Sequence, residues 1–253
     1  MMINMRRIKR LTPSITLVVF YHSAAVQSIS MMYFGNDIFV PLLVSFSYDI
    51  LNKIMNAARC IAMEHSGTRT LETKRLILRR FTIGDAEDVF RNWAGDDEVT
   101  KYLTWPPHKN IEVTKAYIMS LLESYPQPNT YDWAIELKEI GRAIGSISVV
   151  RQDEPAGCVH VGYCIGKPWW NKGITSEAFS AVISYLMDEV KVDRIDSRHD
   201  PRNIYSGKVM EKCGLKYEGT FKESDENNRG ICDAAWYALL RKDYLAAKQS
   251  GTV

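Results

Sequence analysis

The sequence has few cysteines and histidines, and they form no recognisable pattern. Its 253 residues include five of each. No two cysteines stand in a CxxC spacing, and no cysteine–histidine spacing matches a zinc motif, so we predict no metal site. An odd number of scattered cysteines is typical of proteins that fold in a reducing compartment. This favours a cytoplasmic location.

Two phosphate-binding signatures are also absent. The sequence contains neither the Gly-Lys-Ser/Thr ending of a P-loop nor the three-glycine fingerprint of dinucleotide-binding folds. It has no internal repeat and no low-complexity tract. These absences argue against P-loop enzymes, dinucleotide-dependent dehydrogenases and repeat proteins.

No region concentrates positive charge on the scale that nucleic-acid binding needs. The chain carries 32 Lys/Arg and 30 Asp/Glu, a net charge of +2. Six of these basic and two of these acidic residues lie in residues 1–62, which leaves 26 basic and 28 acidic residues in residues 63–253. Because affinity for nucleic acid depends on a dense basic face, we expect no nucleic-acid partner.

The first 62 residues differ in composition from the rest. Residues 11–36 contain no Asp, Glu, Lys or Arg and follow a basic start, which resembles a signal peptide or membrane anchor. Serine and threonine interrupt the apolar run, however, and a spanning helix needs about 20 mostly apolar residues. Met63 would be a natural start. We therefore predict an N-terminal extension, residues 1–62, before a catalytic domain, residues 63–253, and no membrane partner.

Three interpretations of the extension stay open. It is a segment outside the working protein, an extension that packs on the domain or is disordered, or a membrane or secretion segment. Expression from Met63 with retained activity and solubility would exclude the last.

The most informative pattern lies in the middle of the chain. Residues 159–166 form a short apolar run that predicts a strand, and residues 176–190 have apolar side chains at helical spacing. Between them, residues 170–175 include Gly173. The first N–H groups of a helix lack internal partners and carry partial positive charge, and glycine lets an anion approach the backbone. The pattern therefore predicts a site for a ligand that carries phosphates.

The remaining periodicities predict one mixed-sheet α/β domain. Apolar alternation and β-rich composition predict strands, and 3.6-residue spacing predicts helices. The expected strands cover residues 71–81, 131–137, 143–150, 159–166, 194–197, 217–221 and 234–240, and the expected helices cover residues 84–93, 112–123, 176–190 and 203–212.

Four ordered blocks resemble the GNAT N-acetyltransferases. The segment from Gly162 to Ala178, GYCIGKPWWNKGITSEA, is similar to the acetyl-CoA motif of that family, and its nearest likeness is to the RimJ/RimL-type ribosomal-protein N-acetyltransferases. The resemblance extends over residues 70–245. The other matching blocks are residues 71–79, residues 133–136 with 141–146, and residues 203–206 with 211–215 and 218–219.

The resemblance implies a fold, a cofactor and a reaction. The fold would be a single GNAT-type α/β domain, with a mixed, mostly antiparallel sheet, a splayed central parallel pair and helices on both faces. The cofactor would be acetyl-CoA, whose acetyl group passes by direct attack in a ternary complex to a primary amine. The amine would be a protein N-terminus or a small molecule. A homodimer is also common among such enzymes. The alternative is a catalytically inactive CoA-binding module of the same fold.

The resemblance also assigns cofactor contacts. The motif departs from the general pattern at Trp170, Asn171 and Thr175, where the family more often has Gln/Arg, glycine and a small residue. The residues expected to bind the cofactor are Tyr163, Cys164, Ile165, Gly166, Trp170, Asn171, Lys172, Gly173, Ile174, Thr175, Asn203 and Ser206.

The catalytic groups are predicted with alternatives left open. Ser206 is expected to protonate the leaving thiolate, and Tyr205 is the competing acid. His160 stands where relatives often carry a glutamate base, and a histidine can accept a proton near neutral pH. Glu136, Asp132 or a water molecule are the other candidate bases.

Aromatic residues are expected to wall the acceptor side, with core packing as the competing explanation. The predicted substrate-binding residues are Trp105, His108, Tyr131, Trp133 and Glu136.

Overall fold

The computed structural model describes residues 8–12, 15–20, 28–35, 38–47 and 63–251. The chain divides into two compact units, Met1–Ile61 and Ala62–Val253. The first unit contains one antiparallel sheet, in the order β1 (Ile8–Thr12), β2 (Ile15–Phe20), β3 (Ser28–Gly35) and β4 (Ile38–Ser47). The small residues 23–25 of the resemblance to a signal peptide lie outside the described residues.

The apolar stretch considered as an anchor therefore forms strand β2 rather than a helix. Across the described residues, we find no helix with both the length and the apolar character needed to cross a bilayer. The role of the first unit stays a prediction.

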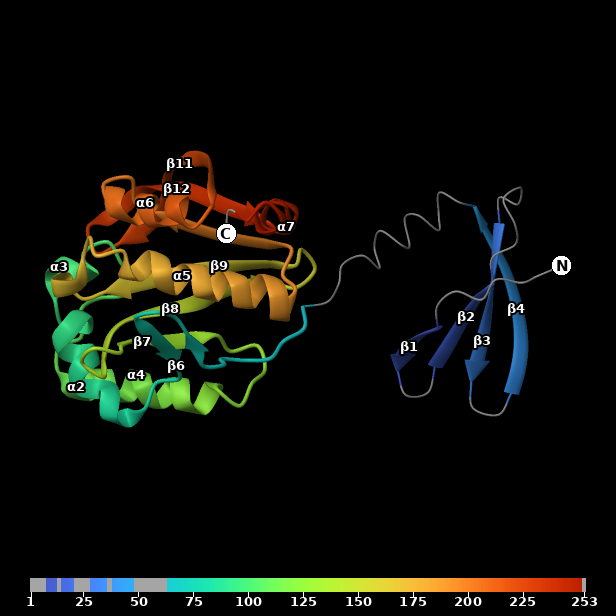
Figure 1. Cartoon of the computed structure of the whole chain (residues 1–253), viewed down its shortest axis with the longest axis horizontal. Helices are drawn as coiled ribbons and strands as arrows, with labels where there is room; N and C mark the ends of the chain where they lie inside the picture. Colours follow the sequence, from blue (N-terminus) through green and yellow to red (C-terminus); the bar gives the residue numbers. More distant parts are fainter. Residues whose placement is uncertain (1–7, 13–14, 21–27, 36–37, 48–62, 252–253) are drawn as a thin grey trace. The chain divides into compact units, whose positions relative to one another are not determined.

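The second unit is built on an eight-stranded sheet with the order β11-β12-β10-β9-β8-β7-β6-β5 (Figure 1). The predicted strand over residues 71–81 is two strands separated by a turn, and the other six predicted strands are present. The strands are β5 (Leu71–Glu72), β6 (Leu76–Arg79), β7 (Asp132–Leu137), β8 (Arg142–Asp153), β9 (Cys158–Ile165), β10 (Arg194–His199), β11 (Lys216–Asn227) and β12 (Gly230–Leu240).

Helices cover both faces of this sheet. The helix α5 packs on β5, β6 and β9, whereas α2 packs on β8 and on α4. Two helices, α3 and α7, fall outside the predicted ones. The helical segments are η1 (Ile83–Asp85), α2 (Ala86–Val89), η2 (Phe90–Ala94), α3 (Asp97–Thr100), α4 (Ile111–Ser124), η3 (Lys167–Trp169), α5 (Ile174–Tyr185), η4 (Leu186–Val190), α6 (Ile204–Lys212) and α7 (Arg241–Gln249).

The two central strands, β9 and β10, run parallel and separate after three residue pairs. Backbone pairing joins Cys158 through His160 to Arg194 through Asp196 and then stops, although β9 continues to Ile165 and β10 to His199. The Ser197 hydroxyl donates to the Val161 carbonyl at 2.7 Å. Beyond that bond the strands diverge, which confirms the predicted splayed pair.

Two apolar clusters fill the two faces of the sheet. The larger one includes Trp133, Ile147, Val161 and Phe179 and lies under α5. The smaller one includes Trp93 and Ile118 and lies under α2 and α4. Because both faces of β7, β8 and β9 are covered, side chains of either parity along these strands are largely removed from water.

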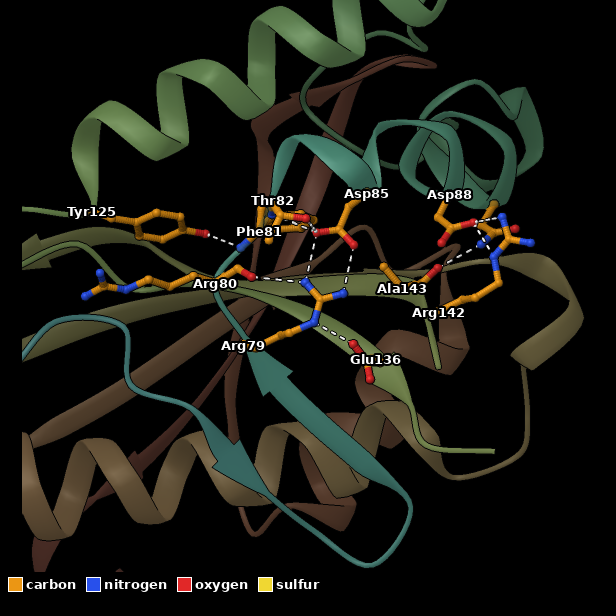
Figure 2. A network of polar contacts seen from close by, with 11 residues as sticks. Arg79, Arg80, Phe81, Thr82, Asp85, Asp88, Tyr125, Glu136, Arg142 and Ala143 are labelled. Atoms are coloured by element: carbon orange, nitrogen blue, oxygen red, sulfur yellow. Dashed lines mark hydrogen bonds and ion pairs between the residues drawn. The ribbon is translucent and has the colours of Figure 1, made fainter. Parts of the chain in front are cut away.

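A charged network joins the edge of the sheet to the first helical segment (Figure 2). The Arg79 guanidinium donates to both carboxylate oxygens of Asp85 at 2.8 Å and to Glu136 at 2.5 Å. Burial alone would raise the pKa of Asp85, but hydrogen bonds from Arg79 and Thr82 hold it below its usual range. The network fixes the start of η1 against β6 and β7.

Candidate functional site

The turn that precedes α5 presents free backbone N–H groups. Gly173 caps the helix with φ 71° and ψ 10°, and Asn171 also has positive φ, 59°. The first helical hydrogen bond runs from Glu177 N–H to the Gly173 carbonyl at 3.1 Å. In the described part of the chain, the N–H groups of residues 171–176 donate no hydrogen bond to the protein. Such a row of unpaired donors at a helix start is a phosphate site.

A second layer of contacts holds this turn in place. Arg75 donates to the Lys172 carbonyl at 3.0 Å and to the Glu177 carboxylate at 2.6 Å. The Thr73 hydroxyl donates to the other oxygen of Glu177, also at 2.6 Å. Burial alone would raise the pKa of Glu177, but hydrogen bonds from Thr73 and Arg75 keep it below its usual range. The first turn of α5 is therefore tied to the turn between β5 and β6.

We expect Glu177→Gln to raise KM for acetyl-CoA about five- to tenfold and to lower stability by about 1–2 kcal/mol, because a charge-assisted contact is lost. Since the pKa of Glu177 is lowered, this stability is present at neutral pH and disappears as pH falls through that pKa. Steady-state kinetics and urea unfolding measure both effects. Glu87→Gln, at an exposed pair with Arg91, is the matched control. A normal KM in a destabilised Glu177→Gln enzyme would contradict the anchoring role.

The end of β9 is positioned by close packing and by a tryptophan. The indole N–H of Trp170 donates to the Ile165 carbonyl at 2.8 Å. Gly166 is buried, and a Cβ there would lie 2.5 Å from the Asn92 carbonyl oxygen and 2.8 Å from the Trp169 ring. Only glycine fits between these groups, so the chain turns sharply from β9 toward the phosphate site.

Helix α6 faces β9 across the split. The Tyr163 hydroxyl donates to the Ser206 carbonyl at 2.8 Å, and the Ser206 hydroxyl donates to the Tyr163 oxygen at 3.1 Å. Asn203 is the N-cap residue of α6, yet its side chain makes no capping hydrogen bond. Its amide is therefore free to bind a ligand. Tyr205 is 57% exposed, and Lys208 lies over its ring.

These elements enclose a cavity of about 600 Å³. It runs from the phosphate site along the split between β9 and α6, and α3 and the residues after it form the opposite wall. Of the predicted cofactor-binding residues, buried Gly166 and exposed Lys172 do not line it. The predicted residues that do are Tyr163, Cys164, Ile165, Trp170, Asn171, Gly173, Ile174, Thr175, Asn203 and Ser206, together with Tyr205.

Part of the predicted acceptor wall lies beside this cavity. The rings of Trp105 and His108 are 5.5 Å apart, and the His108 ring is 5.9 Å from that of Tyr117 on α4. The tip of the β11–β12 hairpin holds this segment, because the Asn228 amide donates to the carbonyls of Thr100 at 2.9 Å and Trp105 at 2.7 Å.

The other three predicted substrate residues lie elsewhere. Tyr131 and Trp133 are almost fully buried and pack on Tyr185 beneath α5, on the opposite face of the sheet. Glu136 is bound by Arg79. The core-packing explanation accounts for all three placements, and we assign them no part in acceptor binding.

His160 is placed away from the cavity. Its Nδ1 atom forms a close contact with the Asp196 carboxylate, and its Nε2 atom is 3.3 Å from an Arg198 nitrogen. The side chain is buried against Trp236. Both ring nitrogens are therefore occupied by protein groups, an arrangement typical of a histidine that holds two strands together. Its predicted role as the base stays untested.

The comparisons with known proteins agree with this geometry. The Acetyltransferase (GNAT) domain model matches residues 75–216, more than half of the chain. The "uncharacterized N-acetyltransferase p20" of Bacillus licheniformis is 27% identical over 175 residues, which are 69% of this chain and 98% of that protein. A GNAT-family acetyltransferase structure from Bacillus anthracis aligns with a TM-score of 0.61 at 26% identity, over 69% of this chain and 99% of that one.

A shorter match has a named acceptor. The [ribosomal protein uS5]-alanine N-acetyltransferase of Escherichia coli (strain K12) is 34% identical over 64 residues, 25% of this chain and 33% of that enzyme. The predicted family, fold and cofactor are confirmed. The chain belongs to the GNAT acetyltransferases, which take their acetyl group from acetyl-CoA.

Proposed function

We propose that this enzyme acetylates a primary amine that enters from the side of Trp105 and His108, and that a protein N-terminus is the first acceptor to test. A small amine is the second. The observation that carries the proposal is the single cavity that joins the free N–H groups before α5 to the split between β9 and α6. The match to the ribosomal-protein enzyme supports the choice of a protein N-terminus.

The binding roles follow from the donors available. The N–H groups of residues 171–176 would hold the pyrophosphate, since helix-start donors favour negative charge. The diverging edge of β9 from Tyr163 to Ile165 would pair with the pantetheine arm as an added strand does. Asn203 would bind the amide groups of that arm. Lys172, which is exposed outside the cavity, would add only a solvated positive charge near the phosphates.

The chemistry is direct transfer. The uncharged amine attacks the thioester carbonyl carbon, the C–N bond forms, and the C–S bond breaks as the thiolate leaves. Burial raises the pKa of the Cys164 thiol to about 11, so this cysteine stays protonated at neutral pH and an acyl-cysteine intermediate is disfavoured. We assign Ser206 as the donor to the leaving thiolate. Its hydroxyl is half-buried and oriented by Tyr163, whereas Tyr205 is mostly exposed.

We expect Ser206→Ala to lower kcat about 10- to 100-fold, at the low end of what proton donation contributes, with little change in the affinity for acetyl-CoA. Tyr205→Phe is the control and should stay within about threefold of the parent enzyme. Single-turnover kinetics with saturating acetyl-CoA measure the chemical step. A large loss in Tyr205→Phe with a normal Ser206→Ala would transfer the role to Tyr205.

Two measurements test the function as a whole. Acetyl-CoA and CoA should raise the melting temperature, whereas ATP and NAD should not, because only ligands that bind the native state stabilise it. Release of free thiol is then followed with peptides of varied N-terminal residue and with a panel of small amines. Stabilisation by CoA without turnover of any amine would favour the inactive binding module. The homodimer and the cytoplasmic location stay predictions.

A further inference from the structure

One buried carboxylate on the acceptor side has no partner. Asp132 begins β7, and strand alternation directs its side chain to the face opposite Tyr131 and Trp133. Its backbone is fully bonded, with its N–H donating to Thr68 at 2.9 Å and its carbonyl accepting from Tyr125 at 3.1 Å. Among residues 63–251, no hydrogen bond or ion pair reaches its carboxylate. Buried carboxylates are rarely left so.

The sheet register connects this carboxylate with the cavity. Asp132 pairs with Ser148 on β8, and Ser148 pairs with Gly162 on β9, so the three form one row on one face. Two strand spacings put Asp132 about 10 Å from Gly162. Small side chains at both intervening positions leave the row open. Two residues beyond Gly162, Cys164 lines the cavity.

The groups around Asp132 are uncharged. Tyr117 and Tyr125 approach it from α4, and Cys164 approaches it from β9. Burial raises the pKa of the Asp132 carboxyl to about 7, and burial raises the pKa values of both tyrosines and of the cysteine as well. No positive charge of the protein neutralises Asp132, so the site favours a cation supplied from outside.

We infer that Asp132 binds the ammonium group of a cationic acceptor and takes its proton. This inference rests on the proposed function and names the class of its substrate as amines that are protonated at neutral pH. The carboxylate accepts one proton from R–NH₃⁺ and leaves R–NH₂, whose lone pair attacks the thioester carbonyl. After the acetylated product leaves, Asp132 releases that proton to solvent. A base that titrates near the working pH is the most effective one.

The other candidate bases are already engaged. Glu136 lies on the same strand and the same face, but Arg79 holds it as a carboxylate inside the network of Figure 2. His160 is paired with Asp196. Asp132 alone of these three combines burial with a carboxylate that the described residues leave unpaired.

The test is the pH dependence of Asp132→Asn, with Asp243→Asn on α7 as a matched control at a remote, exposed pair with Lys216. For a basic acceptor, kcat/KM of the parent enzyme should rise with pH and level off near pH 7. Asp132→Asn should lose about 100-fold at pH 7 and recover as the acceptor itself deprotonates. A weakly basic amine, uncharged at pH 7, should lose much less. An unchanged profile and kcat/KM within threefold would overturn the inference.

A stability measurement guards against misfolding of the variant. A carboxyl group whose pKa is raised on folding destabilises the native state increasingly as pH rises from its unfolded value toward about 7. Asp132→Asn should therefore melt higher than the parent protein, by a margin that grows between pH 4 and pH 8. A variant that is more stable and less active identifies a functional group, while a pH-independent difference in melting temperature would reject the unpaired carboxylate. If the parent enzyme turns over no amine at all, the proposed function fails instead.

Discussion

Replacing Arg79 with methionine is expected to destabilise the domain by about 3 kcal/mol at pH 7.5, because the carboxylates of Asp85 and Glu136 then stay buried without their partner. The three side chains are only 24%, 7% and 17% exposed, so water cannot replace the guanidinium. For a domain of this size, the loss corresponds to a fall of about 6–12 °C in melting temperature. Calorimetry and urea unfolding measure it.

The control for this experiment lies in the same view (Figure 2). Arg142 pairs with Asp88, but Arg142 is 56% exposed, so Arg142→Met should cost about 1 kcal/mol or less. The pH dependence gives a second check. Because the pKa of Asp85 is lowered on folding, the ion pair stabilises above the unfolded pKa and is lost as pH falls through the folded one. The gap between Arg79→Met and the parent protein should narrow toward pH 4, and a constant gap would mean that lost packing, rather than charge, is responsible.

The second large effect is expected at Gly166, where alanine should lower stability by about 2–3 kcal/mol through overpacking and weaken acetyl-CoA binding at least tenfold. The backbone of Gly166, with φ −59° and ψ 143°, suits any residue, so the cause is the contact of a Cβ with the Asn92 carbonyl and the Trp169 ring. The Asn92 side chain is itself bonded to the Ala143 carbonyl at 2.8 Å, which limits relief by movement.

Gly84→Ala provides the matched change, because the nearest atom to its added Cβ is 3.5 Å away. It should leave melting temperature and acetyl-CoA affinity near those of the parent. Isothermal titration with CoA and thermal unfolding of both variants complete the comparison. Full CoA affinity in Gly166→Ala would show that the turn tolerates displacement.

The order of elements around the cofactor site could be predicted from the sequence because its signals are local. A strand, Gly173 and a helix follow one another within about 30 residues, and glycine is the residue that permits the observed φ of 71°. The strand at residues 71–81 was less well placed, since Thr73 bonds to the Leu76 carbonyl and N–H and turns the chain. Helix α7 buries only Tyr244, too little for an apolar period.

The site residues that sequence reasoning misplaced were decided by distant partners. Alternation groups Tyr131 with Trp133 correctly, but it cannot say which face of an interior strand meets the cavity when helices cover both. His160 finds Asp196 36 residues later, across the parallel pair. Asp132 was only one of several candidate bases, because its lack of a partner is a property of the folded neighbourhood. The sole sequence signal was an acid at the start of an otherwise apolar strand.

The place of β12 in the sheet has a consequence for synthesis of the chain. β12 pairs along the whole of β10, from Arg194 to His199, and β10 is the strand that forms one side of the split. A nascent chain that ends before Gly230 contains every residue of the phosphate-binding turn, yet β10 would be an open edge that can recruit strands from other molecules. Productive folding of the thioester-binding half therefore waits for the last hairpin to leave the ribosome.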